Sequence, residues 1–277
     1  MLRDIFSPQS KPFIDVNPQG GLGNRLFTLH FASQMASMFS ADLRTSQFSQ
    51  EQEWMRRSPA VLDGPKWSAV ARVWQSKPPS TLSSDVVAEV GKRLARGKSV
   101  RLFRPLLGEV FFDSCFQPPI ELFPNCPKPT GRVDIAAHFR GGDFHYWNPA
   151  SILAASYYID AYKWVAGALG REPQVAIVSD DWDHPSLPGF QRFLEREGSL
   201  KPYLSRDTSA IQDFQTLMSA RYLISCPSTF GIWAGILGEP LVVHSRKWVE
   251  QRVEAKDKFW CDLYRGGNEH YHCVHLV

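Results

Sequence analysis

The sequence has few cysteines and lacks several features that identify common protein classes. Its five cysteines form no CxxC pair, which argues against a zinc cluster and indicates a reducing compartment. No stretch approaches the roughly 18 apolar residues of a membrane span, and the first residues contain no apolar segment typical of a signal peptide. The net charge of +3 is too balanced for nucleic acid or a membrane surface as the main partner. We therefore expect a soluble, cytoplasmic protein with no transmembrane segment and no nucleic-acid partner, unless a membrane anchor lies outside this sequence.

The sequence also lacks GxSxG, HExxH, P-loop and protein-kinase motifs, and nothing in it supports a serine or cysteine nucleophile. Its composition, 43% hydrophobic and 21% charged, is that of an ordinary globular protein. A length of 277 residues suits one large or two medium domains. The segment 117–131 contains five prolines and is the best linker candidate. We place the two domains at residues 1–127 and 128–277.

The first domain is predicted to begin with a strand at 13–16, a glycine loop at 18–23 and a helix. One face of this helix is apolar, with Phe27, Phe31, Met35, Met38 and Phe39. Residues 42–83 contain scattered prolines and tryptophans, which indicate loops and short helices that would bind the acceptor. A helix at 85–97 and a strand at 100–103 follow, with a further strand expected at 108–112.

The second domain alternates regularly between apolar strands and helices. We expect strands at 133–138, 174–178, 201–204, 222–226 and 240–244. We expect helices at 151–169, 186–196, 210–220, 229–237 and 246–255. Ser151, Ser209 and Ser228 are the predicted N-caps of three of them. This alternation is typical of a doubly wound parallel sheet, so the fold class is α/β.

An anion site is predicted where the strand 133–138 ends. Arg140 follows that strand, then come Gly141 and Gly142, then Asp143. Glycines let the backbone approach a ligand closely, and arginine presents a planar fork of donors that suits phosphate oxygens. Ligands of α/β sheets bind beyond the carboxyl ends of the strands. The alternative is a tight turn with an Arg–Asp surface pair of little energetic value.

Two other strand ends in this domain carry polar residues that should converge with Arg140. Ser228 and Thr229 at a helix start supply hydroxyl and N–H donors for phosphate. Asp180 and Asp181 are suited instead to accept hydrogen bonds from a base or from ribose hydroxyls. Together these residues predict a nucleoside diphosphate in the second domain.

The glycine loop of the first domain, which includes Gly21 and Gly23, is a second candidate ligand site. Asn24 and Arg25 lie at the predicted helix start, where free backbone N–H groups favour an anion or a polar ligand. The loop does not have the third glycine of the GxGxxG dinucleotide fingerprint, and a β–α turn without a ligand is the alternative.

Two metal sites are alternatives. Asp180, Asp181 and Asp183 could hold Mg²⁺ or Mn²⁺ as an Asp-x-Asp motif, or could serve only as helix caps and surface charges. The C-terminal histidines at 270, 272 and 275 have a spacing that could hold zinc, although surface histidines are the more common explanation.

Four stretches, in order, resemble glycosyltransferase family 11, the α-1,2-fucosyltransferases. They are GGLGNRLFTLHFASQMA, AAHFRGGDF, AIVSDDW and DFQTLMSARYLISCPSTFGIWAGIL, and the resemblance spans roughly residues 13 to 245. The second stretch resembles the family motif His-x-Arg-Arg-Gly-Asp. The third resembles its Ser-Asp-Asp stretch, and the fourth its Leu-Met-Ser and Ser-Thr-Phe-x-x-Trp stretch.

The resemblance implies two Rossmann-like domains facing across a cleft (GT-B type). It also implies an inverting transfer of L-fucose from GDP-β-L-fucose to a hydroxyl of a glycan acceptor, with no obligatory metal cofactor. The nucleotide-sugar donor and the glycan are thus the expected partners.

The resemblance further implies roles for individual residues. Arg140 would clamp the β-phosphate and stabilise the departing GDP, flanked by Ser228, Thr229 and Phe230. His138 and the Asp180–Asp181 pair would lie near the nucleoside. Asn24 would face the sugar or the acceptor, beside nucleotide-sugar contacts from Gly21, Gly23 and Arg25.

The sequence departs from the family pattern at Gly141, where the motif has a second arginine. No base for the acceptor hydroxyl is evident, and Asp143 is the candidate. The alternatives are therefore a transferase of another nucleotide sugar such as UDP-xylose, a metal-dependent transferase, and a non-catalytic module that binds a nucleotide sugar or glycan.

Overall fold

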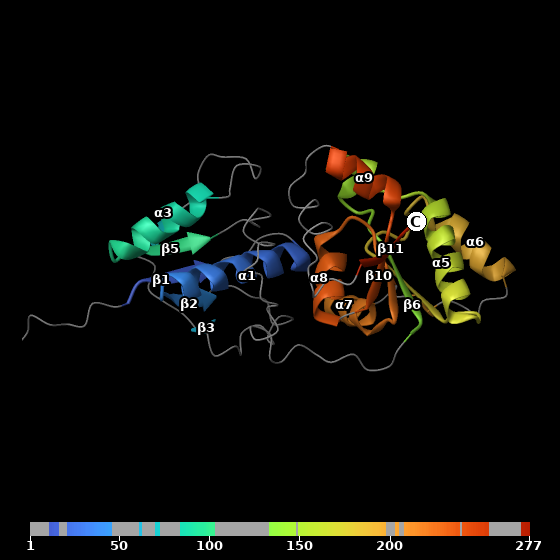
Figure 1. Ribbon diagram of the computed structural model, residues 1–277, viewed down its shortest axis with the longest axis horizontal. Coiled ribbons are helices and arrows are strands. Elements are labelled where there is room, and N and C mark those ends of the chain that lie inside the picture. Colours follow the sequence, from blue (N-terminus) through green and yellow to red (C-terminus); the bar gives the residue numbers. More distant parts are fainter. Residues whose placement is uncertain are drawn as a thin grey trace, which may run out of the picture. The chain divides into compact units, whose positions relative to one another are not determined.

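The computed structural model describes residues 11–16, 21–45, 61–62, 70–72, 84–102, 133–147, 149–197, 203–204, 208–238, 240–254 and 273–277. They divide into two compact units, one containing β1–β5 and the other β6–β11 (Figure 1). The predicted domain boundary between residues 127 and 128 lies outside the described residues. So do the predicted strand at 108–112 and the histidines at 270 and 272.

The first unit contains a five-stranded parallel sheet in the order β3-β2-β1-β5-β4. Its strands are β1 (Phe13–Val16), β2 (Asp42–Thr45), β3 (Val61–Leu62), β4 (Val70–Arg72) and β5 (Ser99–Leu102). Helix α1 (Leu22–Met38) connects β1 to β2, and α3 (Ser84–Ala95) lies between β4 and β5 in the chain. The strands β2, β3 and β4 fall within 42–83, so the prediction of loops and short helices is wrong at these three segments.

The misassigned strand β2 reads Asp-Leu-Arg-Thr, with a single apolar residue, so its sequence does not resemble a buried strand. Its pairing is instead a tertiary effect: Leu43 is buried, and the Arg44 guanidinium lies 3.8 Å from the centre of the Phe13 ring on the neighbouring strand. An arginine stem covering an aromatic ring can occupy a position where an apolar residue is expected.

The sheet of this unit is buried under the predicted apolar face of α1. Phe27, Phe31 and Met35 are at most 1% exposed, as the periodicity predicts. Met38, predicted on the same face, is the last residue of the helix and is 60% exposed.

The second unit contains a six-stranded, wholly parallel sheet in the order β11-β10-β9-β6-β7-β8. Its strands are β6 (Ile135–Phe139), β7 (Val175–Ser179), β8 (Tyr203–Leu204), β9 (Tyr222–Ile224), β10 (Leu241–His244) and β11 (Cys273–Leu276). Numbered from its own first strand, this order is 3-2-1-4-5-6, the doubly wound arrangement of nucleotide-binding folds. The predicted α/β class with two Rossmann-like sheets is confirmed.

The helices of this unit are α4 (Phe144–Trp147), α5 (Ala155–Leu169), α6 (Leu187–Arg196), α7 (Ala210–Ser219), α8 (Thr229–Gly238) and α9 (Arg246–Glu254). Figure 1 shows α5 and α6 on one face of the sheet and α7 and α8 on the other. Both faces of β6 and β7 are therefore covered, and all five residues of each strand are buried.

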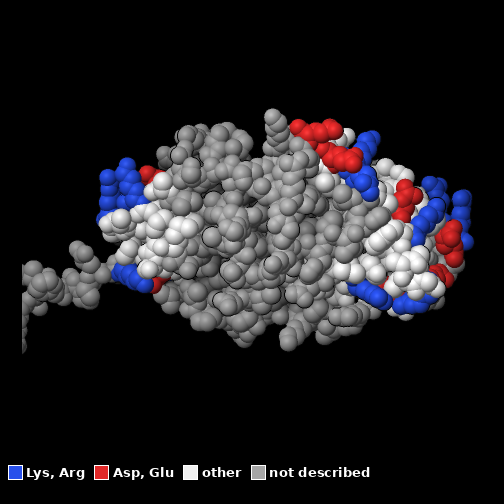
Figure 2. Space-filling model, viewed as in Figure 1, with Lys and Arg blue, Asp and Glu red and all other residues white. Residues whose placement is uncertain are grey.

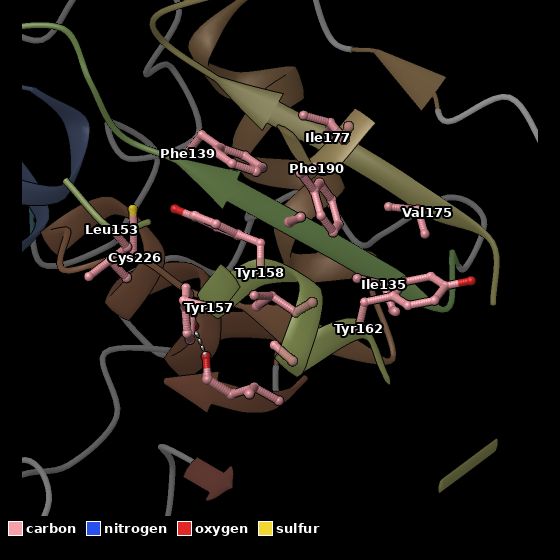
Figure 3. Packing of buried hydrophobic residues seen from close by; sticks show 14 of the residues in the cluster. Ile135, Phe139, Leu153, Tyr157, Tyr158, Tyr162, Val175, Ile177, Phe190 and Cys226 are labelled. Carbon is pink, nitrogen blue, oxygen red and sulfur yellow. Dashed lines mark hydrogen bonds between the residues drawn. The ribbon is translucent and has the colours of Figure 1, made fainter. Parts of the chain in front are cut away.

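An aromatic cluster forms the core between the sheet and α5 and α6 (Figure 3). Phe139 stacks on Tyr158 with ring centres 3.8 Å apart, and Phe190 of α6 packs against both rings. The Tyr157 hydroxyl donates to the carbonyls of Ser225 and Val243, at 2.7 and 2.9 Å. The core thus fixes the carboxyl ends of β6 and β9 against the start of α5.

The helix starts agree with the sequence in two of three places. Ser209 caps α7 in a capping box with Gln212, and the Ser228 hydroxyl accepts the Phe230 N–H at the start of α8. Ser151 does not cap α5: it is buried in a short 3-10 turn (Pro149–Ser151), and the helix begins only at Ala155. A side chain four residues before the helix cannot reach its first N–H groups.

The described surface of the second unit mixes charges of both signs. On the face shown in Figure 2, lysines and arginines alternate with aspartates and glutamates. Among the described residues, no helix is long and apolar enough to cross a membrane.

Candidate functional site at the carboxyl edge of the second sheet

The candidate site lies where the strand order of the second sheet reverses. The first strand of this unit, β6, lies in the middle of the sheet, with β7 on one side and β9 on the other. Loops leaving β6 and β9 at such a switch point diverge to opposite faces and leave a crevice beyond the carboxyl ends of the strands. Arg140 follows β6, and Ser228 follows β9, so two of the predicted phosphate-binding segments flank this switch point.

The register of β6 and β7 brings the third predicted segment to the same place. Phe139 pairs with Ser179, so the next residues on each strand, Arg140 and Asp180, leave the sheet side by side. Arg140 forms an ion pair with Asp180 and another with Asp143, the latter at 2.5 Å. Its side chain is 29% exposed and also lies over the Phe144 ring, 5.2 Å from its centre. The guanidinium is thus partly open to solvent and held between two carboxylates.

The Asp180 carboxylate completes this arrangement from the other side. One of its oxygens accepts the Gly141 N–H at 3.1 Å. Burial raises the pKa of Asp180, and the charge of Arg140 opposes that shift. The ion pair between Arg140 and Asp180 is partly buried at the edge of the sheet. An incoming phosphate must therefore compete with the Asp180 carboxylate for Arg140.

The two glycines after Arg140 are required by these carboxylates. A Cβ at Gly141 would overlap the Asp181 carboxylate and lie 2.8 Å from the Asp181 Cβ. Gly142 has φ +24° and faces the Asp180 carboxylate in the same way. Position 141, where the family motif has a second arginine, therefore has no space for any side chain while Asp181 keeps its place.

Asp181 contacts His145, a residue that the sequence does not predict for the site. The His145 Nε2 lies 2.7 Å from Asp181 Oδ2, and the other carboxylate oxygen accepts the Asp183 N–H at 3.0 Å. Little in the sequence indicates this pair, because His145 lies outside the motif, two residues after Asp143, and its partner is 36 residues away.

A buried layer lies directly beneath the loop. His138 is 3% exposed, its Nδ1 is 3.4 Å from the Cys226 sulfur, and its ring centre is 5.6 Å from that of Phe230. Burial, followed by the charge of Arg140, lowers the pKa of His138 to about 3, so the imidazole is neutral. Burial raises the pKa of the Cys226 thiol, which is therefore not a nucleophile.

The helix start at Ser228 packs tightly against this layer. Ser228 is buried, Thr229 and Phe230 are half-buried, and the Phe230 ring also contacts Phe214 of α7. A Cβ at Gly231 would lie 2.7 Å from the Ser225 hydroxyl and 3.0 Å from His138 Nδ1. The absent side chain at 231 thus lets α8 approach β6.

The remaining predicted residues belong to the first unit. Helix α1 begins at Leu22, slightly earlier than expected, so Gly23, Asn24 and Arg25 lie in its first turn. Gly21 is exposed just before the helix, and its carbonyl accepts the Arg25 N–H at 3.1 Å. The Asn24 carbonyl accepts the Thr28 hydroxyl at 3.0 Å. Their functional roles stay predictions, as do those of the predicted site residues in the second unit.

Among the described residues, no three histidine, cysteine, aspartate or glutamate side chains are grouped as a metal would require. Asp180 faces Arg140, whereas Asp181 faces His145, so these two carboxylates point to different partners. The predicted zinc-binding spacing at 270, 272 and 275 falls on side chains outside the described set.

No protein-family model matches the sequence, and no curated protein matches it. Similar solved structures include the iron-containing dodecameric glycosyltransferase TibC from enterotoxigenic E. coli, with 14% identity and a TM-score of 0.46 over 84% of this chain. They also include POFUT1 in complex with GDP, with 11% identity and a TM-score of 0.49 over 81% of this chain and 94% of that one. The E. coli ADP-heptose LPS heptosyltransferase II has 12% identity and a TM-score of 0.49 over 84% of each chain. The chain spans 57% of the length of TibC.

Proposed function

We propose that the protein is an inverting glycosyltransferase that transfers L-fucose from GDP-β-L-fucose to a hydroxyl of a glycan, as the resemblance to glycosyltransferase family 11 implies. The observation that carries the proposal is the position of Arg140. It is a partly exposed guanidinium at the carboxyl end of the first strand of a doubly wound sheet, beside the switch point where such sheets bind nucleotides.

The diphosphate is the part of the donor that this site recognises. Arg140 would take the β-phosphate, and the start of α8 with Ser228 and Thr229 would donate N–H and hydroxyl groups to the same anion. As the sugar leaves, charge accumulates on the diphosphate, and a fixed cation there lowers the barrier. Phe230 would flank the diphosphate, while His138 and Asp180 contribute near the nucleoside.

Donor binding must rearrange the loop. Arg140 is bound to Asp143 and Asp180, so a phosphate has to replace at least one of these carboxylates. Asp143 is 58% exposed and is easily replaced, because exposed ion pairs contribute little. Once released, Asp143 is a candidate to accept a proton, as the sequence suggested.

The first unit would supply the acceptor side of a GT-B enzyme. In this proposal Asn24, at the start of α1, contacts the sugar or the acceptor, and Gly21, Gly23 and Arg25 contact the nucleotide sugar. No metal is required, since Arg140 and the helix start provide the positive charge that a divalent cation supplies in metal-dependent transferases.

Calorimetric titration with GDP, UDP, ADP and dTDP, each with and without EDTA, tests the proposal, followed by an assay of GDP release from GDP-fucose with a panel of glycans. Binding of GDP alone, unaffected by EDTA, together with acceptor-dependent release, is expected. Preference for UDP would replace the donor with a sugar such as UDP-xylose. Loss of binding in EDTA would indicate a metal-dependent transferase. Binding without release for any acceptor would indicate a non-catalytic module, and no binding at all would refute the site.

A further inference from the structure

The loop after β6 presents an imidazole as well as a guanidinium. His145 in α4 has a side chain that is 39% exposed, and its Nε2 lies 2.7 Å from Asp181 Oδ2. Asp181 itself is only 17% exposed. A histidine held at one nitrogen by a half-buried carboxylate and open at its other edge is the usual arrangement of an oriented proton acceptor.

The carboxylate that holds His145 is fixed from several directions. The Asp181 N–H donates to the Ser179 hydroxyl at 3.1 Å, and that hydroxyl donates to the Asp181 carbonyl at 2.6 Å. The Asp181 Oδ1 accepts the Asp183 N–H at 3.0 Å, which leaves Oδ2 for the imidazole. The space for this carboxylate exists because position 141 is glycine.

This hydrogen bond selects the tautomer of His145. When Nε2–H donates to Asp181, the lone pair of the neutral ring lies on Nδ1. No hydrogen bond reaches Nδ1 from the residues that the structure describes, so that nitrogen can accept a proton. The negative charge of Asp181 would then stabilise the imidazolium that forms.

We propose that His145, oriented by Asp181, is the group that takes the proton from the acceptor hydroxyl. This inference rests on the proposed transferase function and assigns the role of base to His145 in place of Asp143, the candidate from the sequence. In the step, the acceptor oxygen forms a bond to the anomeric carbon of the donor sugar. The bond from that carbon to the diphosphate breaks, its electron pair leaves with the nucleoside diphosphate, and the hydroxyl proton moves to Nδ1 of His145.

The neighbouring carboxylates separate the two tasks. Asp180 faces the guanidinium of Arg140, which would meet the leaving group, whereas Asp181 faces His145, which would meet the nucleophile. Tyr146, the residue after His145, is 91% exposed, which is unusual for a large aromatic side chain. An acceptor sugar stacked on its ring would remove this apolar surface from water.

The charged and titratable groups around His145 define the controls. Asp181 contacts His145 directly. His184, three residues after Asp181, interacts electrostatically with both Asp181 and His145. Burial lowers the pKa of His184 to about 4, so its imidazole is neutral at pH 7. Asp183 is an exposed acid of the same turn with no hydrogen bond from its carboxylate to His145 among the described contacts.

The test measures kcat and KM against pH for the full-length protein and its H145Q, D181N and D183N variants, using GDP-fucose and saturating acceptor, with GDP affinity from calorimetry. His145→Gln keeps a donor to Asp181 but removes the proton acceptor. It is expected to lower kcat by about 100-fold or more and to remove the acidic limb of the kcat profile, with GDP affinity within about twofold. Asp181→Asn is expected to lower kcat by about tenfold or more while KM stays within about twofold, because the imidazole loses the carboxylate that orients it. Asp183→Asn should change each quantity by about twofold or less.

Wild-type kcat and an unchanged pH profile in H145Q would overturn the proposal. So would a loss of GDP affinity in H145Q as large as its loss of kcat, because that would show a structural link between the two loops. Nitrogen-15 NMR of the histidine rings gives a readout that needs no activity: His145 is expected as the Nε2–H tautomer, and an Nδ1–H tautomer would overturn the assignment. If the wild-type protein transfers no sugar but shows the expected tautomer, the hydrogen bond between His145 and Asp181 is confirmed and the proposed transferase function is refuted. The role of His145 as a base is then refuted as well.

Discussion

Replacing Arg140 by alanine tests the central feature of the site. In the free protein the guanidinium pairs with Asp143 and Asp180, and we expect the diphosphate to take their place. The variant loses the phosphate contact and also leaves the half-buried Asp180 carboxylate facing the anion without a cation. Both effects weaken binding in the same direction.

The size of the loss follows from the contacts exchanged. A hydrogen bond to a charged group contributes about 1.5–3 kcal/mol, and the Asp143 pair that phosphate displaces is 58% exposed at its carboxylate and offsets little of it. We therefore expect Arg140→Ala to weaken GDP binding by roughly 10- to 150-fold. The transfer rate should fall by a further factor of about 100 to 1,000, because the cation also stabilises the leaving group.

Arg171 provides a matched control, because it pairs with an aspartate at the amino end of β6, whereas Arg140 lies at the carboxyl end. It forms a two-pronged pair with Asp134, at 2.8 and 2.6 Å, just before β6 begins. Arg171→Ala removes a comparable Arg–Asp pair far from the carboxyl edge, so GDP affinity should stay within about twofold. Calorimetry on both variants measures GDP affinity, and melting curves measure the loss of stability from each Arg–Asp pair. Equal losses in the two variants, or unchanged GDP affinity in Arg140→Ala, would refute this reasoning.

Three further predictions concern packing, pH and metal. Gly141→Ala would force the Asp181 carboxylate out of its place and should lower the free energy of unfolding by about 1–3 kcal/mol, whereas Gly167→Ala, where nothing lies within 4 Å, should be neutral or stabilising in the same denaturant titration. Burial lowers the pKa of His138 and His244 to about 3, from about 6.5, so protonation favours the unfolded chain. Stability should be full above about pH 6.5 and fall by up to about 1.4 kcal/mol per pH unit for each histidine below it, and a flat acid profile would contradict this. EDTA should leave both GDP affinity and transfer unchanged, and a rate restored by added Mg²⁺ would contradict the metal-free site.

The sequence by itself determined the class of the second unit. Strands that are buried on both faces are apolar along most of their length, so Ile135–Phe139 and Val175–Ser179 could be recognised as central parallel strands although each contains one polar residue. Local signals also sufficed at Ser209, because a capping box depends only on residues three apart. They failed at Ser151 and across β2–β4, where packing decided the outcome and local preference was weak.

The site itself was only half determined by the sequence. A cation, two glycines and an acid after a buried strand identified the loop, since those residue types are unfavourable in a core. The partners of Arg140 and the pairing of His145 with Asp181 were decided by the register of β6 on β7, which sets Phe139 opposite Ser179. Contacts between residues 36 to 40 positions apart depend on that alignment, and a shift of one residue would turn the side chains of the strand to the other face of the sheet. The sequence therefore named the chemistry available at this edge, and the parallel sheet decided which groups act together.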